Sequence, residues 1–192
     1  MSTSAYQLPR RYSLTVDEYH RMADARIFPP DVRTELIEGE IIEIPPIGAP
    51  HAGITKRLIS LLTRAVGDKA IVDAQDPVVL DVYLEPQPDL ALLSWRPDFY
   101  VKSHPRPADI LLLVEIADTT LEYDRNTKIP LYARVEIPEV WLIDVNGRHL
   151  DIYRHPAEGR YTARRRATTL RSLRIAALPD VIFDLSTLFD DI

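Results

Sequence analysis

The sequence predicts an α/β protein with a mixed central sheet flanked by helices. Residues 50–66 repeat apolar side chains at helical spacing, which indicates an amphipathic helix that packs on one face of a sheet. Residues 110–114 form the apolar run Ile-Leu-Leu-Leu-Val, which is typical of a strand buried on both faces. Short apolar segments flank Gly39 and Gly147, and a glycine between two such segments predicts a hairpin.

The composition is that of a globular protein. Of the 192 residues 46% are hydrophobic and 27% charged, and we expect one domain over 12–192 after a loose segment over 1–11. The absence of cysteine excludes disulfides and thiolate metal sites. The N-terminal residues have no apolar signal core, and the run 110–114 is too short to cross a bilayer. We therefore expect a cytoplasmic protein with no membrane partner.

The N-terminal part of the domain is expected to contain a helix followed by a hairpin. Residues 13–22 read as a short helix, in which Thr15 and Glu18 have the spacing of a capping box. Two apolar segments, 33–37 and 40–44, are separated by Glu-Gly, which predicts an antiparallel pair of strands.

The middle of the chain is expected to supply the centre of the sheet. Helix 50–66 ends at a glycine, and one or two strands are expected within 70–83, at 70–74 and 78–82. Further strands are expected over 88–93 and 109–116, the first beginning at a proline, which costs no ladder bond at a strand start. We place all four of these strands centrally.

The C-terminal part begins with a helix over 126–134, in which Pro130 is expected near the start because proline breaks a helix interior. A strand over 139–145 follows. Asn-Gly then predicts a hairpin of further strands. A short helix beginning at Ser186 is expected near the end of the chain.

The net charge of −6 argues against a surface that binds nucleic acid throughout, since phosphate contacts supply most non-specific affinity. The basic residues nevertheless cluster late in the sequence. This cluster reads either as the solvated face of a hairpin or as a DNA-binding patch. Its members are Arg160, Arg164, Arg165, Arg166, Arg171 and Arg174.

Two acids, Asp89 and Glu115, lie at the ends of two apolar strands, and Lys128 follows on the next helix. Carboxylate oxygens suit Mg²⁺, which proteins usually hold with one or two carboxylates while water and phosphate complete the shell. A nearby lysine can steady the attacking water or the charge that develops on phosphorus. Glu115 could instead form a salt bridge or cap a helix, and Lys128 could form a surface ion pair with Asp124 on the same helix face.

The order of these motifs resembles the PD-(D/E)XK nucleases of the restriction-endonuclease-like fold, and over residues 12–190 it is similar to the Uma-two family of endonucleases. One departure from the broad nuclease pattern is Ala117, which stands where a lysine is expected two residues after Glu115. The resemblance rests on Glu35-Leu-Ile-Glu-Gly-Glu40, Pro50-His51, Pro88-Asp89, Val114-Glu115, Asp124-Arg-Asn-Thr-Lys128, Leu131-Tyr-Ala-Arg134 and Ile137-Pro-Glu-Val-Trp-Leu-Ile-Asp144.

The resemblance implies a restriction-endonuclease-like core and a lysine that has moved to the following helix, as Lys128. It implies that Asp89, Glu115 and the main-chain carbonyl of Ile116 bind Mg²⁺ or Mn²⁺. It also places Glu35 and His51 near the metal. On the residues alone, Glu35 could equally be an exposed strand carboxylate and His51 a surface or capping residue.

We therefore expect metal-dependent hydrolysis of a nucleic-acid phosphodiester, with DNA as the first choice of substrate. Two alternatives stay open: a non-catalytic module that keeps the nuclease fold for binding or assembly, and a hydrolase of small phosphate esters. The alanine at position 117 and the acidic net charge favour the non-catalytic module. Nucleic acid is the expected partner, and a homodimer is left open.

Overall fold

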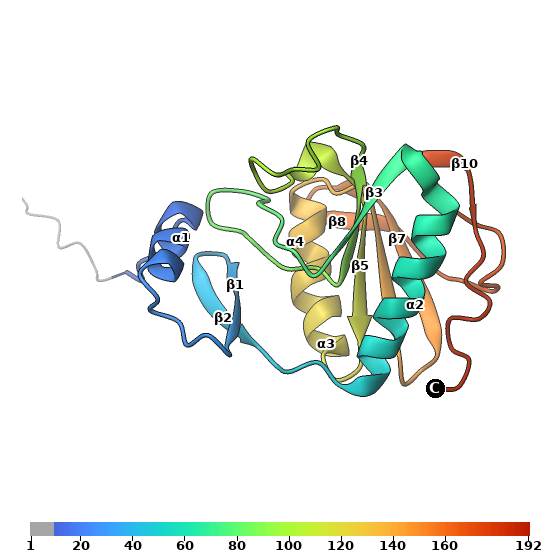
Figure 1. Ribbon diagram of the computed structural model, residues 1–192, viewed down its shortest axis with the longest axis horizontal. Helices are drawn as coiled ribbons and strands as arrows, with labels where there is room; N and C mark the ends of the chain where they lie inside the picture. Colours follow the sequence, from blue (N-terminus) through green and yellow to red (C-terminus); the bar gives the residue numbers. More distant parts are fainter. Residues whose placement is uncertain (1–9) are drawn as a thin grey trace, which may run out of the picture.

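The computed structural model describes residues 10–192 and contains one six-stranded sheet with helices on both faces (Figure 1). The order across the sheet is β3-β4-β5-β6-β7-β8. Strands β5 and β6 run parallel and the other neighbours run antiparallel, so the sheet is mixed, as predicted. The strands are β3 (Ala70–Ala74), β4 (Leu90–Ser94), β5 (Ile110–Ala117), β6 (Glu139–Asp144), β7 (His149–Ala157) and β8 (Arg160–Arg166).

Two hairpins and the helices complete the described part of the chain. Residues 1–9, most of the segment predicted to be loose, lie outside the described residues. The elements are α1 (Val16–Asp24), β1 (Arg33–Ile37), β2 (Glu40–Ile44), α2 (Ala49–Val66), η1 (Gly67–Lys69), η2 (Pro107–Asp109), α3 (Leu121–Tyr123), η3 (Asp124–Lys128), α4 (Ile129–Arg134), β9 (Leu173–Ile175) and β10 (Leu178–Phe183).

The two central strands β4 and β5 alternate their side chains between two apolar cores. Leu92 and Leu112 pack in the core that contains the buried face of α2, whereas Leu93 and Leu113 pack in the core that contains α4. Successive side chains of a strand point to opposite faces, so a strand covered on both sides must be apolar throughout. This explains the continuous apolar run of β5.

The N-terminal elements agree closely with the sequence patterns. Thr15 caps α1 in a capping box with Glu18, and β1 and β2 have the predicted bounds. The hairpin is joined to the segment before β4 by two main-chain hydrogen bonds between Leu36 and Glu85, of 3.2 and 2.8 Å. Figure 1 shows α1 and this hairpin beside the main sheet, with an extended connection from β2 to α2.

The predicted strand 78–82 is wrong, because this segment forms only isolated bridges. The N–H of Val78 donates to the carbonyl of Pro86, but Pro86 has no N–H with which to return the bond. The N–H of Val79 donates to the carbonyl of Pro105, outside this segment. A ladder therefore cannot extend along the segment.

The central placement of strand 70–74 is also wrong. In the described sheet β3 pairs with β4 alone and forms one edge, while β5 and β6 lie at the centre. The order of strands in a sheet depends on long-range pairing, and the apolar pattern of β3 does not encode it.

The helix predicted over 126–134 begins five residues earlier, at Leu121, and connects the parallel strands β5 and β6. It contains one π-turn, η3, closed by a hydrogen bond from the N–H of Ile129 to the carbonyl of Asp124. Pro130 follows at the start of α4. Proline cannot donate to the ladder, so the wider π-turn lets the chain continue as a helix past it.

The C-terminal region forms β9 and β10, and the predicted helix at Ser186 is replaced by turns. Phe183 of β10 packs edge-on against Trp141 of β6, with ring centroids 5.9 Å apart. Two arginines of the basic cluster share one buried carboxylate. Arg164 and Arg166 bind the buried carboxylate of Asp151 at 2.7 and 3.1 Å.

No helix among residues 10–192 has the length and apolar character needed to cross a membrane.

The β1–β2 turn gives a direct test of the fold. Gly39 has φ +78°, and a Cβ at this position would lie 2.5 Å from the Cβ of Ser13. Because both the conformation and the space disfavour a side chain, Gly39→Ala should lower the free energy of unfolding by about 1–3 kcal/mol. Denaturant unfolding followed by circular dichroism measures the change.

The matched control is Gly53→Ala, within α2, where an added Cβ would meet nothing within 4 Å. This substitution should raise the free energy of unfolding by about 0.5–1 kcal/mol, because alanine favours a helix more than glycine does. Equal effects of the two substitutions would contradict the described turn.

Candidate active site

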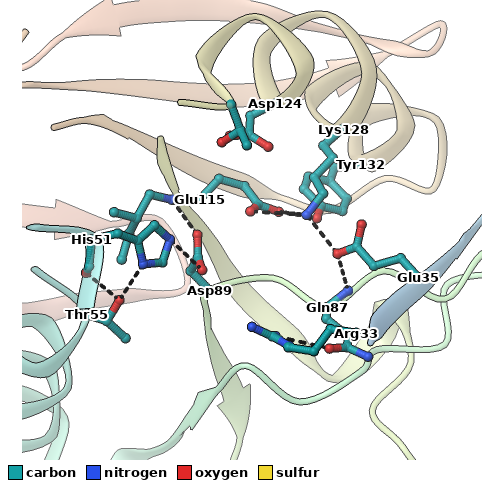
Figure 2. Close-up of polar contacts among 12 residues, drawn as sticks. Arg33, Glu35, His51, Thr55, Gln87, Asp89, Glu115, Asp124, Lys128 and Tyr132 are labelled. Atoms are coloured by element: carbon teal, nitrogen blue, oxygen red, sulfur yellow. Dashed lines mark hydrogen bonds and ion pairs between the residues drawn. The ribbon is translucent and has the colours of Figure 1, made fainter. Parts of the chain in front are cut away.

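A cavity of about 430 Å³ lies where hairpin β1–β2, the start of α2 and the end of β5 meet. Figure 2 shows how the polar side chains approach one another from these elements. Every residue that the sequence analysis placed in the site contributes to its lining. These residues are Glu35, His51, Asp89, Glu115, Ile116 and Lys128.

Asp89 and Glu115 come together through the antiparallel pairing of β4 with β5. Leu90 pairs with Val114, so the next positions along the two strands, Asp89 and Glu115, are neighbours at the same end of the sheet. The N–H of Ile116 donates to Oδ2 of Asp89 at 2.8 Å, which fixes the aspartate beside β5. Both acids line the same cavity.

Lys128 points into the same site from the π-turn. Its Nζ donates to Oε1 of Glu35 at 2.9 Å and lies 3.4 Å from the carboxylate of Glu115. The side chain is 8% exposed. The alternative of a surface ion pair with Asp124 is therefore wrong, and the predicted orientation of Lys128 toward the acids is confirmed.

Glu35 is buried, so the alternative of an exposed strand carboxylate is wrong. Besides the lysine, its Oε1 accepts the main-chain N–H of Gln87 at 2.8 Å. The side-chain amide of Gln87 donates to the carbonyl of Thr34 at 3.1 Å. These bonds fix β1 against the segment that leads to Asp89, and they hold the Glu35 carboxylate in the cavity.

His51 stands at the start of α2 and pairs with Asp89, with 3.0 Å between Nε2 and Oδ1. Its Nδ1 lies 3.4 Å from Oγ1 of Thr55, one turn further along the helix. Burial acts to lower the pKa of His51, but the hydrogen bond and charge of Asp89, with the charges of Asp118 and Asp124, raise it overall. The imidazole is thus held toward Asp89.

The acids outnumber the cations in this site. Burial raises the pKa of Glu115 well above its ordinary value, against the opposing effect of Lys128, and the neighbouring acids raise it further. Burial likewise raises the pKa of Asp124, which accepts a hydrogen bond of 2.6 Å from Oγ1 of Thr120. Burial would lower the pKa of Lys128, but the surrounding carboxylates raise it, so the ammonium stays charged.

Comparison with known proteins identifies the family and the fold of the chain. Residues 16–186 match the model of the Uma2 family, described as "putative restriction endonuclease". The chain belongs to the Uma2 family. It is also similar to the crystal structure of a "putative nuclease belonging to DUF820" from Anabaena variabilis ATCC 29413, with a TM-score of 0.70 and 17% identity. The match covers 92% of this chain and 97% of that one, and it shows the shared fold. No curated protein matches.

Several side chains of this Uma2 site lie outside the set that the sequence analysis assigned to it. Tyr132, one helical turn after Lys128, donates its hydroxyl to Oε1 of Glu115. Its spacing from the lysine, i to i+4, is the signal that could have assigned it. Thr120 and Tyr123 line the cavity because the helix begins earlier than predicted. The sequence gives no comparable signal for Arg33.

Burial alone does not distinguish the acids of the site. Glu139 is also fully buried, but its carboxylate accepts bonds from Trp141, Arg154 and the N–H of Ala176 at 2.7–3.0 Å, which join three parts of the fold. Glu139 does not line the cavity.

Among residues 10–192, no three side chains of the metal-binding types form a group arranged to hold a metal ion. A cation here would therefore need main-chain oxygen or water besides the two carboxylates.

The first prediction from this site concerns stability. Replacing Lys128 with methionine leaves Glu35 and Glu115 buried without their shared cation. Removing one partner of a buried ion pair typically costs about 3–5 kcal/mol, so Lys128→Met should lower the free energy of unfolding by that amount. Thermal and denaturant unfolding at neutral pH measure the change.

Two further variants control this measurement. Lys56→Met replaces an exposed lysine of α2 and should change stability by less than about 0.5 kcal/mol. Adding Glu35→Gln to Lys128→Met removes one of the two carboxylates that have lost their cation, and it should recover part of the lost free energy of unfolding. A Lys128→Met protein as stable as the wild type would show that the ammonium does not balance these acids.

Proposed function

We propose that this Uma2 chain is a metal-dependent nuclease that hydrolyses phosphodiester bonds of nucleic acid, with DNA as its substrate. The observation that carries the proposal is the convergence of Asp89, Glu115 and Lys128 in one cavity. The family description supports a nuclease, and the excess of buried carboxylates supports a requirement for a cation.

The residues fit a hard divalent cation such as Mg²⁺ or Mn²⁺. The carboxylates of Asp89 and Glu115 and the carbonyl of Ile116 would hold it, because such ions prefer oxygen ligands. Burial raises the pKa of Glu115 well above its ordinary value and the neighbouring acids raise it further, so a cation held beside this carboxylate would stabilise its ionised form. When bound, the cation would lower the pKa of a coordinated water and polarise the phosphate.

The remaining side chains hold and orient the reacting groups. Lys128 presents a charged ammonium that can stabilise negative charge developing on the phosphate. His51 fixes the aspartate through its 3.0 Å contact, and Tyr132 fixes the glutamate through its hydroxyl. Supporting contacts of this kind typically change metal affinity or activity about 10–100-fold when removed.

One observation favours the alternative of a non-catalytic module. Lys128 is already bound by Glu35 and Glu115, so the network would also be stable as a purely structural ion cluster. The two functions differ in their response to cations. A structural cluster needs none, whereas the nuclease needs the cation both for chemistry and to offset the acids that would otherwise repel a phosphodiester.

The test combines cleavage with binding. With Mn²⁺ or Mg²⁺ the wild type should cleave DNA. The cleavage rate of Asp89→Asn should be at least about 100-fold lower, which is a larger loss than removal of a supporting residue typically causes. With Ca²⁺, which can occupy oxygen ligands without supporting the chemistry, DNA should bind more tightly to the wild type than in EDTA. Asp89→Asn should not show this increase.

The matched control is Asp68→Asn, which alters an exposed aspartate in η1, outside the cavity lining. This variant should cleave and bind as the wild type does. Equal DNA binding by wild type in EDTA and Ca²⁺, together with no cleavage in Mn²⁺ or Mg²⁺, would contradict the nuclease and support the non-catalytic module.

A further inference from the structure

Three acids of the site lie inside the protein, while the side chain of Asp89 is 16% exposed. Glu35 is 1% exposed, Glu115 2% and Asp124 4%, and all three line the cavity. If the chain is the nuclease proposed above, the scissile phosphate must enter the cavity to reach these groups. The backbone of an intact duplex presents its phosphates on the outside of a wide cylinder, so the depth of the acids constrains the form of the substrate.

One wall of the cavity is largely apolar. It is supplied by the end of β2 and the extended connection that leads to α2, which Figure 1 shows running between the hairpin and the main sheet. Apolar surface of this kind packs against a sugar or the face of a base but contributes no attraction to phosphate. The residues are Ile42, Ile44, Pro45, Pro46 and Ile47.

Arg33 lines the same cavity from β1. Its Nη2 donates to Oε1 of Gln87 at 3.2 Å, and Figure 2 shows the guanidinium lying beside this amide. Among the ion pairs of residues 10–192 none involves Arg33. A guanidinium without a carboxylate partner can grip a phosphate through several N–H groups.

Tyr123 supplies a second donor. Its hydroxyl oxygen is buried and has no hydrogen-bond partner within residues 10–192, although the side chain lines the cavity. Burial, with the nearby carboxylates, raises the pKa of Tyr123 to about 12, so the hydroxyl keeps its proton at neutral pH. A buried hydroxyl without a protein partner is costly, so this group can gain stabilisation by donating to a ligand that enters the cavity.

From these observations we infer that the cavity binds one nucleotide of a strand outside a duplex, so that the substrate is single-stranded or locally unpaired nucleic acid. Arg33 and Tyr123 donate to backbone phosphate oxygens, and the apolar wall packs against the sugar and base. The inference rests on the proposed nuclease function and adds the substrate form that the site accepts.

The size of the cavity agrees with this substrate. Its volume of about 430 Å³ falls in the range of roughly 300–1,000 Å³ found for sites that enclose a small molecule. A nucleotide is a ligand of that size. A duplex is far wider, since the major groove alone spans about 12 Å.

The test compares a labelled 12-nucleotide DNA strand with its duplex, by fluorescence anisotropy in Ca²⁺ and by cleavage in Mn²⁺. The single strand should bind more tightly and be cleaved faster. Tyr123→Phe should weaken binding of the single strand about three- to tenfold, and Arg33→Gln about tenfold or more, because a bond from a charged donor is stronger.

The matched controls are Tyr83→Phe and Arg64→Gln, which change exposed residues outside this cavity and should leave the affinity unchanged. Circular dichroism checks that each variant is folded. A duplex that binds and is cleaved as well as the single strand would overturn the inference, as would unchanged single-strand affinity in both cavity variants.

The single-strand inference and the proposed nuclease function would be contradicted by different results. Cleavage of the duplex alone, abolished by Asp89→Asn, would keep the nuclease and overturn the single-strand site. Absence of Mn²⁺-dependent cleavage on either DNA, with no effect of Asp89→Asn on binding, would overturn the proposed function and the inference with it.

Discussion

The buried ammonium of Lys128 is the interaction on which the arrangement of the site depends. It joins three parts of the chain: Glu35 from hairpin β1–β2, Glu115 from the central strand β5, and the helix that carries the lysine itself. A charge taken out of water must be paired and hydrogen-bonded, or the cost is several kcal/mol. These three elements must therefore meet in one geometry, and that geometry closes the cavity around the acids.

The helical position of the lysine follows from the packing of β5. Ala117, where the broad nuclease pattern has a lysine, is fully buried in the apolar core that also contains Leu113 and Val140. A lysine there would have to displace this core. The helix after β5 instead supplies the cation, and its π-turn falls on the residues that face the site, Asp124 and Lys128. Single π-turns are frequent at functional sites.

The sequence predicted the local features well, because they depend on local chemistry. The capping box of α1 and the β1–β2 hairpin follow from residue spacing within one segment. Asp89 and Glu115 meet through long-range strand pairing, but their positions at the ends of two apolar strands were visible in the sequence. The predictions that were wrong or missing concern features that depend on contacts between residues far apart in the sequence. Prolines at a distance interrupt strand 78–82, long-range pairing puts β3 at the edge, and Arg33 joins the site only because the hairpin docks beside β4.

A crystal structure of the protein soaked in Mn²⁺ would show whether Asp89 and Glu115 together hold a divalent cation. We expect an anomalous peak between the two carboxylates, with oxygen ligands at about 2.0–2.6 Å. A well-ordered cavity without such a peak at saturating Mn²⁺, in which both acids keep only their protein partners, would contradict it.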